Sequence, residues 1–76
     1  MAQVLTTIHH EIIRVLRENS ASYVNPVTSD IIGNALNVTP SYIREQMTPL
    51  QKMDMVGVRR GPGGGYFLAG KQALKL

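Results

Sequence analysis

The sequence predicts an α+β domain in which three helices, one short strand and a C-terminal β-hairpin share a single core. Three observations indicate this architecture. Apolar residues recur at helical spacing in the first half of the chain, Thr39-Pro40 is a strong helix-start signal, and a glycine-rich turn separates two stretches of β-branched and aromatic residues. Because 76 residues leave no room for a second core, we expect one domain over residues 1–70 and a short tail over residues 71–76.

The first helix is expected over residues 3–18 and ends in the polar residues that follow. Its buried stripe consists of aliphatic side chains three or four positions apart: Leu5, Ile8, Ile12, Val15 and Leu16. His9 and His10 are adjacent, and neighbouring helical side chains diverge by about 100°. We therefore expect both histidines at the surface or its boundary, and no metal ion held by the pair.

A short extended segment is expected over residues 23–27, at a sheet edge where Pro26 is tolerated. Thr28 or Ser29 can cap the second helix by accepting a hydrogen bond from a free backbone amide. The second helix is expected over residues 29–36.

Within the second helix, Ile32, Ala35 and Leu36 are the predicted buried residues. Gly33 is expected where a close contact requires a small residue. The helix should end at Asn37, which tolerates the left-handed conformation that a sharp turn requires.

The third helix should begin at Thr39-Pro40, because threonine can cap and a proline in the first turn gives up only an unpaired amide. Ile43, Met47 and Leu50 form its apolar stripe. Pro49 cannot donate to the carbonyl four residues earlier, so we expect a kink or a break near Thr48 instead of a straight helix to Met53. Asp54 is expected in a left-handed conformation.

The last ordered unit is expected to be a hairpin with strands at residues 55–60 and 65–69 and a turn at residues 61–64. A helix, a short strand, two helices joined by a tight turn and a closing basic hairpin form the order of a winged helix-turn-helix, and the hairpin would be its wing.

Charge is unevenly distributed along the chain. Residues 1–43 contain two arginines against three carboxylates, whereas residues 44–76 contain six cations against two carboxylates. A surface for a polyanion therefore belongs to the C-terminal half. The chain contains no cysteine, which excludes disulfides and thiolate metal sites within it and suits a reducing cytoplasm, where we expect the protein. The sequence has no apolar run long enough to span a membrane, and we expect no membrane partner.

These features predict binding to double-stranded DNA and regulation of transcription, with the third helix in the major groove. Arg44 can grip a guanine edge, while Ser41 and Tyr42 suit phosphate oxygens. Glu45 could accept from a cytosine amino group or, as we prefer, pair with a neighbouring base-contacting side chain. The candidate DNA-binding residues on this helix are Thr39, Ser41, Tyr42, Arg44, Glu45, Thr48 and Lys52.

The hairpin supplies the remaining candidates: Arg59, Arg60, Gly61, Gly63 and Gly64. A slender glycine loop lets its backbone approach the sugar-phosphate edge or a narrow minor groove, and Arg60 is the preferred ligand there. The whole set forms one DNA-binding surface only if the third helix and the wing face the same side.

The wing sequence from Arg60 to Ala69, RGPGGGYFLA, closely resembles that of the IscR/NsrR-type winged-helix transcription regulators of bacteria, and Ser41-Tyr42-Ile43 resembles the start of their recognition helix. The resemblance covers about residues 28–70. It implies that Ser41, Tyr42, Arg44 and Arg60 contact operator DNA. Arg44 stands where one regulator of this family has an acidic residue, so base preference is not carried over. The cluster-binding cysteines and long dimerisation helix of that family have no counterpart in these residues, so we expect neither redox sensing nor the usual dimer.

Other functions are weighed against DNA binding. The glycine run has neither nucleotide-loop spacing nor a following helix, and the scattered carboxylates and hydroxyls form no catalytic pattern, so we expect no enzyme and no cofactor. A protein-binding winged helix remains the alternative, and it would depend on exposed apolar residues such as Val4, Ile13 or Tyr23. A monomer covers a single half-site, so we expect a homodimer or cooperative loading on DNA.

Overall fold

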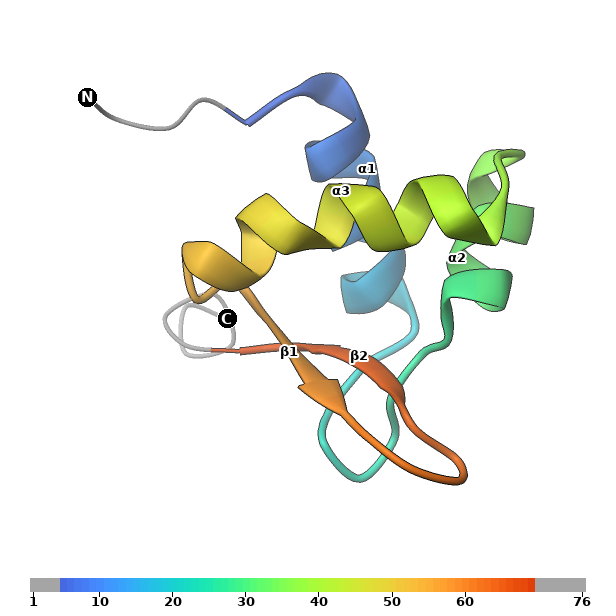
Figure 1. Ribbon diagram of the computed structural model, residues 1–76, viewed down its shortest axis with the longest axis vertical. Coiled ribbons are helices and arrows are strands. Elements are labelled where there is room, and N and C mark those ends of the chain that lie inside the picture. Colours follow the sequence, from blue (N-terminus) through green and yellow to red (C-terminus); the bar gives the residue numbers. More distant parts are fainter. Residues whose placement is uncertain (1–4, 70–76) are drawn as a thin grey trace.

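The computed structural model describes residues 5–69 (Figure 1). The elements follow the order α1 (Thr7–Glu18), α2 (Ser29–Leu36), α3 (Pro40–Lys52), β1 (Val56–Arg59) and β2 (Gly65–Leu68). Three helices with a two-stranded antiparallel hairpin confirm the α+β winged helix-turn-helix. Residues 3 and 4 of the expected first helix, and the tail over residues 71–76, lie outside the described residues.

The first helix begins later than predicted, because Thr6 is extended (φ −87°, ψ 172°) and precedes the first helical residue. His9 is buried, with 6% of its surface exposed, so the expected surface or boundary position is wrong for this histidine and holds for exposed His10. The Thr6 amide donates to His9 Nδ1 at 3.2 Å, so in the neutral ring Nε2 carries the proton and donates to Gln46 Oε1 at 3.1 Å. These bonds connect the start of α1 to α3.

The core lies between the three helices and the sheet. Its fully buried side chains come from all three helices: Ile12, Leu16, Ile32, Ile43, Met47 and Leu50. Ile13 is also buried, at 5% exposure, because α1 packs against α2, α3 and β2 and so buries more than one stripe. This corrects the expectation that Ile13 lies on an exposed protein-binding surface.

A tight turn joins α2 to α3. Asn37 is left-handed (φ 62°), as predicted, and the Val38 amide donates to the Gly33 carbonyl at 2.9 Å. A Cβ at Gly33 would lie 2.6 Å from the Val38 carbonyl oxygen, which confirms the need for a small residue. The buried face of α2 is therefore centred between Ile32 and Gly33, so Ala35 is exposed and its predicted burial is wrong.

Hydroxyl caps begin both helices of this pair. Thr28 Oγ1 accepts from the Ile31 amide and Thr39 Oγ1 from the Tyr42 amide, each at 3.2 Å. Each cap satisfies an amide that has no partner inside its own helix. The first turns of α2 and α3 are thereby fixed.

The third helix runs without a break through Pro49, so the predicted alternative of a break near Thr48 is wrong. Proline removes one hydrogen bond, but here it lies in the last turns of the helix, and the Met53 amide still donates to the Pro49 carbonyl at 3.1 Å. Met47 and Leu50, on either side of Pro49, are fully buried. Their packing holds the helix together where local preference alone would interrupt it.

The hairpin has the predicted strands, shortened by one or two residues, and its register pairs Val56 with Leu68 and Arg59 with Gly65. Val27 adds a bridge at the edge, exchanging two backbone hydrogen bonds of 2.8 Å with Tyr66. The predicted extended conformation is wrong for Tyr23 and Val24, because hydrogen bonds between Ser22 and Asn25 close a turn at these two residues.

Candidate nucleic-acid interface

The exposed face of α3 lies opposite the buried stripe of Ile43, Met47 and Leu50. All seven candidates that the sequence placed on or beside this helix are exposed: Thr39, Ser41, Tyr42, Arg44, Glu45, Thr48 and Lys52. Their side chains do not contribute to the core, so this face of the helix is free to enter a groove wide enough for one helix.

Arg44 is held at the point where the two helices begin. Its Nη1 donates to Ser29 Oγ on α2 at 3.2 Å, and its Nη2 donates to Ser41 Oγ on α3 at 3.1 Å. Both acceptors are neutral hydroxyls, so the positive charge stays uncompensated. The N-terminus of α3, whose first turn has no acidic residue, adds partial positive charge, whereas Asp30 lies in the first turn of α2. Ser29 was not among the predicted site residues, because only the packing of α2 on α3 brings it here.

The tip of the wing is a reverse turn of residues 61–64. The Gly64 amide donates to the Gly61 carbonyl at 3.0 Å, with Pro62 second and Gly63 third at φ 74°. A bonded turn with proline in second place and a left-handed residue in third place has the pattern of a type II turn. Gly61 and Gly63 are exposed, and no heavy atom lies within 4 Å of the place that a Cβ would take, so their backbone is approachable.

Gly64 differs from the other wing glycines. A Cβ there would lie 2.1 Å from the Arg59 carbonyl oxygen, so this glycine is required by the turn itself. Gly64 was predicted to bind DNA, and the structure also gives it a role in the conformation of the turn.

The two adjacent arginines of the wing have different surroundings. Arg60 is exposed and forms no ion pair or hydrogen bond within residues 5–69. Arg59 is partly buried, lies over the ring of Tyr23 at 5.3 Å from its centroid and donates to the Tyr23 carbonyl at 3.1 Å. Tyr23 carried no predicted DNA-binding role, and no local sequence signal links it to a residue 36 positions away.

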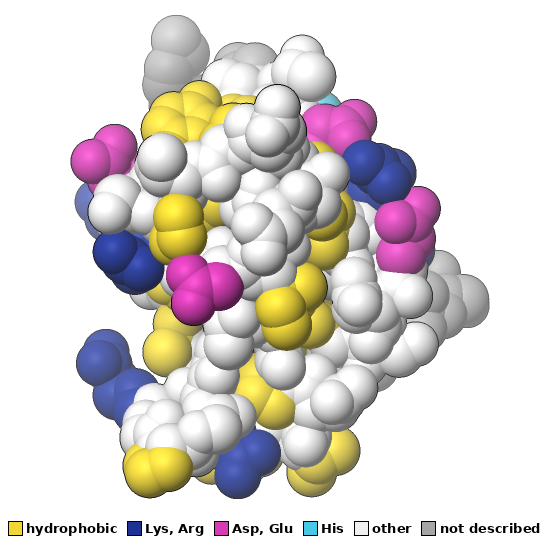
Figure 2. Space-filling model, turned by 90° about the vertical axis from the view of Figure 1, so that its right-hand side faces the viewer, with side chains coloured by type: hydrophobic (Ala, Val, Ile, Leu, Met, Phe, Trp, Pro, Cys, Tyr) yellow, Lys and Arg dark blue, Asp and Glu magenta, His cyan; other side chains and the backbone are white. Residues whose placement is uncertain are grey.

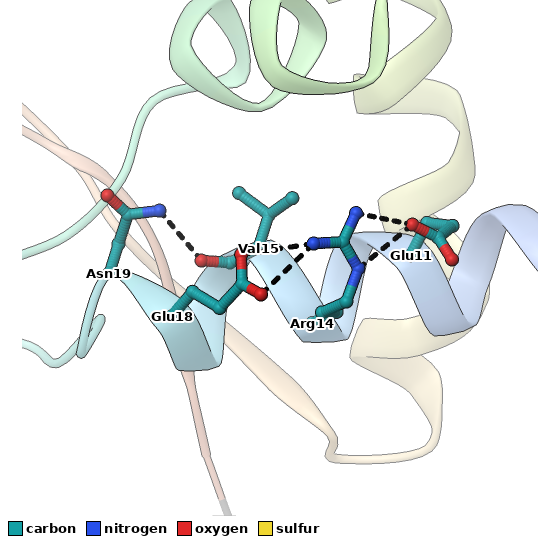
Figure 3. A network of polar contacts seen from close by, with 5 residues as sticks. All are labelled: Glu11, Arg14, Val15, Glu18 and Asn19. Atoms are coloured by element: carbon teal, nitrogen blue, oxygen red, sulfur yellow. Dashed lines mark hydrogen bonds and ion pairs between the residues drawn. The ribbon is translucent and has the colours of Figure 1, made fainter.

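The exposed side of α1 presents a different electrostatic surface. Arg14 is bonded by Glu11 on one side and Glu18 on the other, and Asn19 Nδ2 donates to the Val15 carbonyl at 2.8 Å (Figure 3). The two carboxylates raise the pKa of the Arg14 guanidinium above its ordinary value. This cation is compensated on its own helix, unlike Arg44 and Arg60.

The third helix and the wing share one side of the molecule. In Figure 1, α3 lies in front of the other helices and the hairpin extends below its N-terminal half. Figure 2 shows basic side chains at the wing, at the lower end, and others above them along the left-hand edge, where carboxylate side chains lie among them. The described residues include no helix that is both long and apolar enough to cross a membrane.

Solved structures of other proteins have a similar fold. IscR of T. potens is 24% identical, with a TM-score of 0.63, over 91% of this chain and 50% of that chain. CymR (YrzC), described as the global cysteine regulator of B. subtilis, is 21% identical, with a TM-score of 0.66, over 92% of this chain and 54% of that one. The chain thus spans about half the length of these structures. No curated protein matches it by sequence.

A family model covers nearly the whole chain. The model described as "Rrf2: Iron-dependent Transcriptional regulator" matches residues 4–73. This agrees with the resemblance of the wing and of the start of α3 to IscR/NsrR-type regulators. The chain belongs to the Rrf2 family of transcription regulators.

Proposed function

We propose that this protein binds double-stranded DNA sequence-specifically, with α3 in the major groove and the wing along the adjacent backbone or minor groove. The observation that carries the proposal is the common orientation of two exposed, positively charged surfaces. The free face of α3 around Arg44 and the wing tip around Arg60 lie on one side of the molecule, and neither arginine is paired with a carboxylate within residues 5–69.

The proposed contacts follow from the chemistry of each side chain. Arg44, oriented by Ser29 and Ser41, offers two parallel donors, the arrangement that reads the O6 and N7 atoms of guanine. Tyr42, Thr48 and Lys52, all exposed, are proposed to contact phosphates on either side of the groove. Glu45 is proposed to orient neighbouring base-contacting groups.

At the wing, Arg60 is proposed to neutralise a phosphate or to enter the minor groove, while the exposed backbone of Gly61 and Gly63 approaches the sugar-phosphate edge. One domain covers one half-site, so we propose that stable binding uses two copies, as a homodimer or by cooperative loading. Sedimentation of the full chain with and without a selected duplex tests this, and a monomer in both states would exclude it.

The family description mentions iron, and this chain does not supply a site for it. The sequence contains no cysteine, and residues 5–69 hold no group of three histidine, aspartate or glutamate side chains that could bind a metal ion. The donor set does not fit iron or an iron-sulfur cluster.

Selection from random duplexes followed by a salt titration of the selected duplex tests the proposal. The logarithm of the binding constant should fall linearly with the logarithm of salt concentration, with a slope of about −0.9 per neutralised phosphate. A selection that enriches no sequence would overturn the sequence-specific part. Equal affinity of the Arg44→Ala/Arg60→Ala double variant and the parent would remove both assigned contacts.

A further inference from the structure

We propose that Arg59 positions the wing and is not itself a ligand of DNA. With Tyr23 it forms a clamp that holds the turn of residues 22–25 against the hairpin and so sets the position of Arg60. This inference rests on the proposed DNA binding, and it decides which of two adjacent arginines contacts the nucleic acid.

The first step is the geometry of the clamp. Arg59 uses its guanidinium twice on Tyr23, stacking over the ring at 5.3 Å and donating to the backbone carbonyl at 3.1 Å. The tyrosine ring in turn meets Phe67 edge to face, with centroids 5.7 Å apart and planes at 80°. These contacts hold the Arg59 side chain against the turn of residues 22–25.

The second step is the side of the hairpin on which the clamp lies. Alternate residues of a strand face opposite sides, so Gly57 and Arg59 share the side away from buried Val56. Phe67 lies over Gly57, where a Cβ would be 2.5 Å from the ring. Gly65, which pairs with Arg59, packs against the backbone of Val27, where a Cβ would be 2.8 Å from the Val27 carbonyl. Arg60 follows the end of β1 and is exposed.

The third step connects the clamp to α3. The turn of residues 22–25 leads into Val27, which is hydrogen-bonded to Tyr66, and then into the cap of α2. The tight turn after α2 fixes α3 in relation to it. The clamp therefore connects the wing, near its tip, to the segment that leads into α2 and α3. The pairing of β1 with β2 alone does not make this connection.

The test compares wild type, Tyr23→Ala, Arg59→Ala and the double variant in binding a mixed-sequence duplex over a range of salt concentrations. Tyr23→Ala removes no charge. We expect it and Arg59→Ala each to weaken binding about three- to tenfold, since both lose the stacking of the cation on the ring and Arg59→Ala also loses the hydrogen bond to the residue 23 carbonyl. The double variant should be no weaker than Arg59→Ala alone, because both changes break the same contact.

The opposite result is equally definite. If Arg59 neutralises a phosphate, Arg59→Ala will flatten the salt slope by about 0.9 and Tyr23→Ala will bind like wild type. That outcome would overturn the positioning role. Tyr23→Phe, which keeps the ring and the carbonyl, and Val24→Ala, an exposed neighbour in the same turn, should both bind like wild type.

A measurement without DNA separates the clamp from the proposed function. The side-chain NMR resonances of Arg59 should be displaced by the ring current of Tyr23, and Tyr23→Leu, which keeps an apolar contact for Phe67, should abolish the displacement. Arg59 resonances that do not shift on this substitution would disprove the clamp itself. A wild-type protein with the displacement but without affinity for any duplex would instead disprove DNA binding.

Discussion

Arg44 on α3 donates a hydrogen bond to the hydroxyl of Ser29 at the start of α2, across 3.2 Å. A second bond to Ser41 leaves the planar guanidinium fixed at both ends before any ligand arrives. A preoriented side chain loses less rotamer freedom on binding than a freely moving one. The α2–α3 pair thus prepares the residue proposed to read a base.

Arg44→Lys should relax base preference while leaving the salt dependence unchanged. Lysine keeps the charge but lacks the planar guanidinium, whose fixed parallel donors match the guanine edge. We expect discrimination at one base position to fall by about 1–3 kcal/mol. Competition between the selected duplex and duplexes that each differ from it at one base pair measures this discrimination. Gln51→Ala, an exposed neutral change on α3, is the control, and an unaltered preference in Arg44→Lys would contradict the base contact.

Arg60→Ala should weaken binding to all duplexes alike and flatten the salt slope by about 0.9, because one phosphate contact is lost. Arg14→Ala makes the same change in net charge on α1, where two carboxylates surround the cation, and should leave the slope unaltered. Salt titrations of both variants provide the comparison. Equal slopes in the two variants would show that overall charge, and not position, governs binding.

Gly33→Ala should destabilise the fold although alanine is the better helix former. The new Cβ would meet the Val38 carbonyl at 2.6 Å, and backbone cannot move aside as a flexible side chain can. Overpacking costs about 1–3 kcal/mol, against about 1 kcal/mol recovered from helix propensity. Chemical denaturation measures the net loss. Asn34→Ala, exposed on the same helix, should change stability by less than about 0.5 kcal/mol.

Two wing glycines should respond differently to substitution. Gly63→Asn should preserve the turn, because asparagine tolerates a left-handed backbone and nothing lies near its Cβ. Gly64→Ala should distort the turn, because its Cβ would meet the Arg59 carbonyl at 2.1 Å. Hydrogen exchange of the Val27 and Tyr66 amides measures whether the hairpin stays paired, and duplex binding measures whether the wing still contributes to affinity. A Gly64→Ala protein with native exchange and affinity would contradict the required contact.

The elements that could be predicted are those with local causes. The bounds of α2, the cap at Thr39 and the left-handed Asn37 and Asp54 follow from short-range backbone chemistry, and all are observed. The continuous helix through Pro49 could not be predicted, because it depends on burial of Met47 and Leu50 against other elements.

By itself, the sequence determined the order of the elements, the basic C-terminal half and the amino acids offered to a ligand, because caps, turn residues and periodic apolar side chains act within a few positions. Only the tertiary structure decided which residues work together. It buried Ile13 and His9, brought Ser29 to Arg44 and turned Arg59 toward Tyr23, while Arg60 stayed exposed. The physical reason is that such contacts join residues far apart in the chain, and their geometry exists only once the helices and the hairpin have packed.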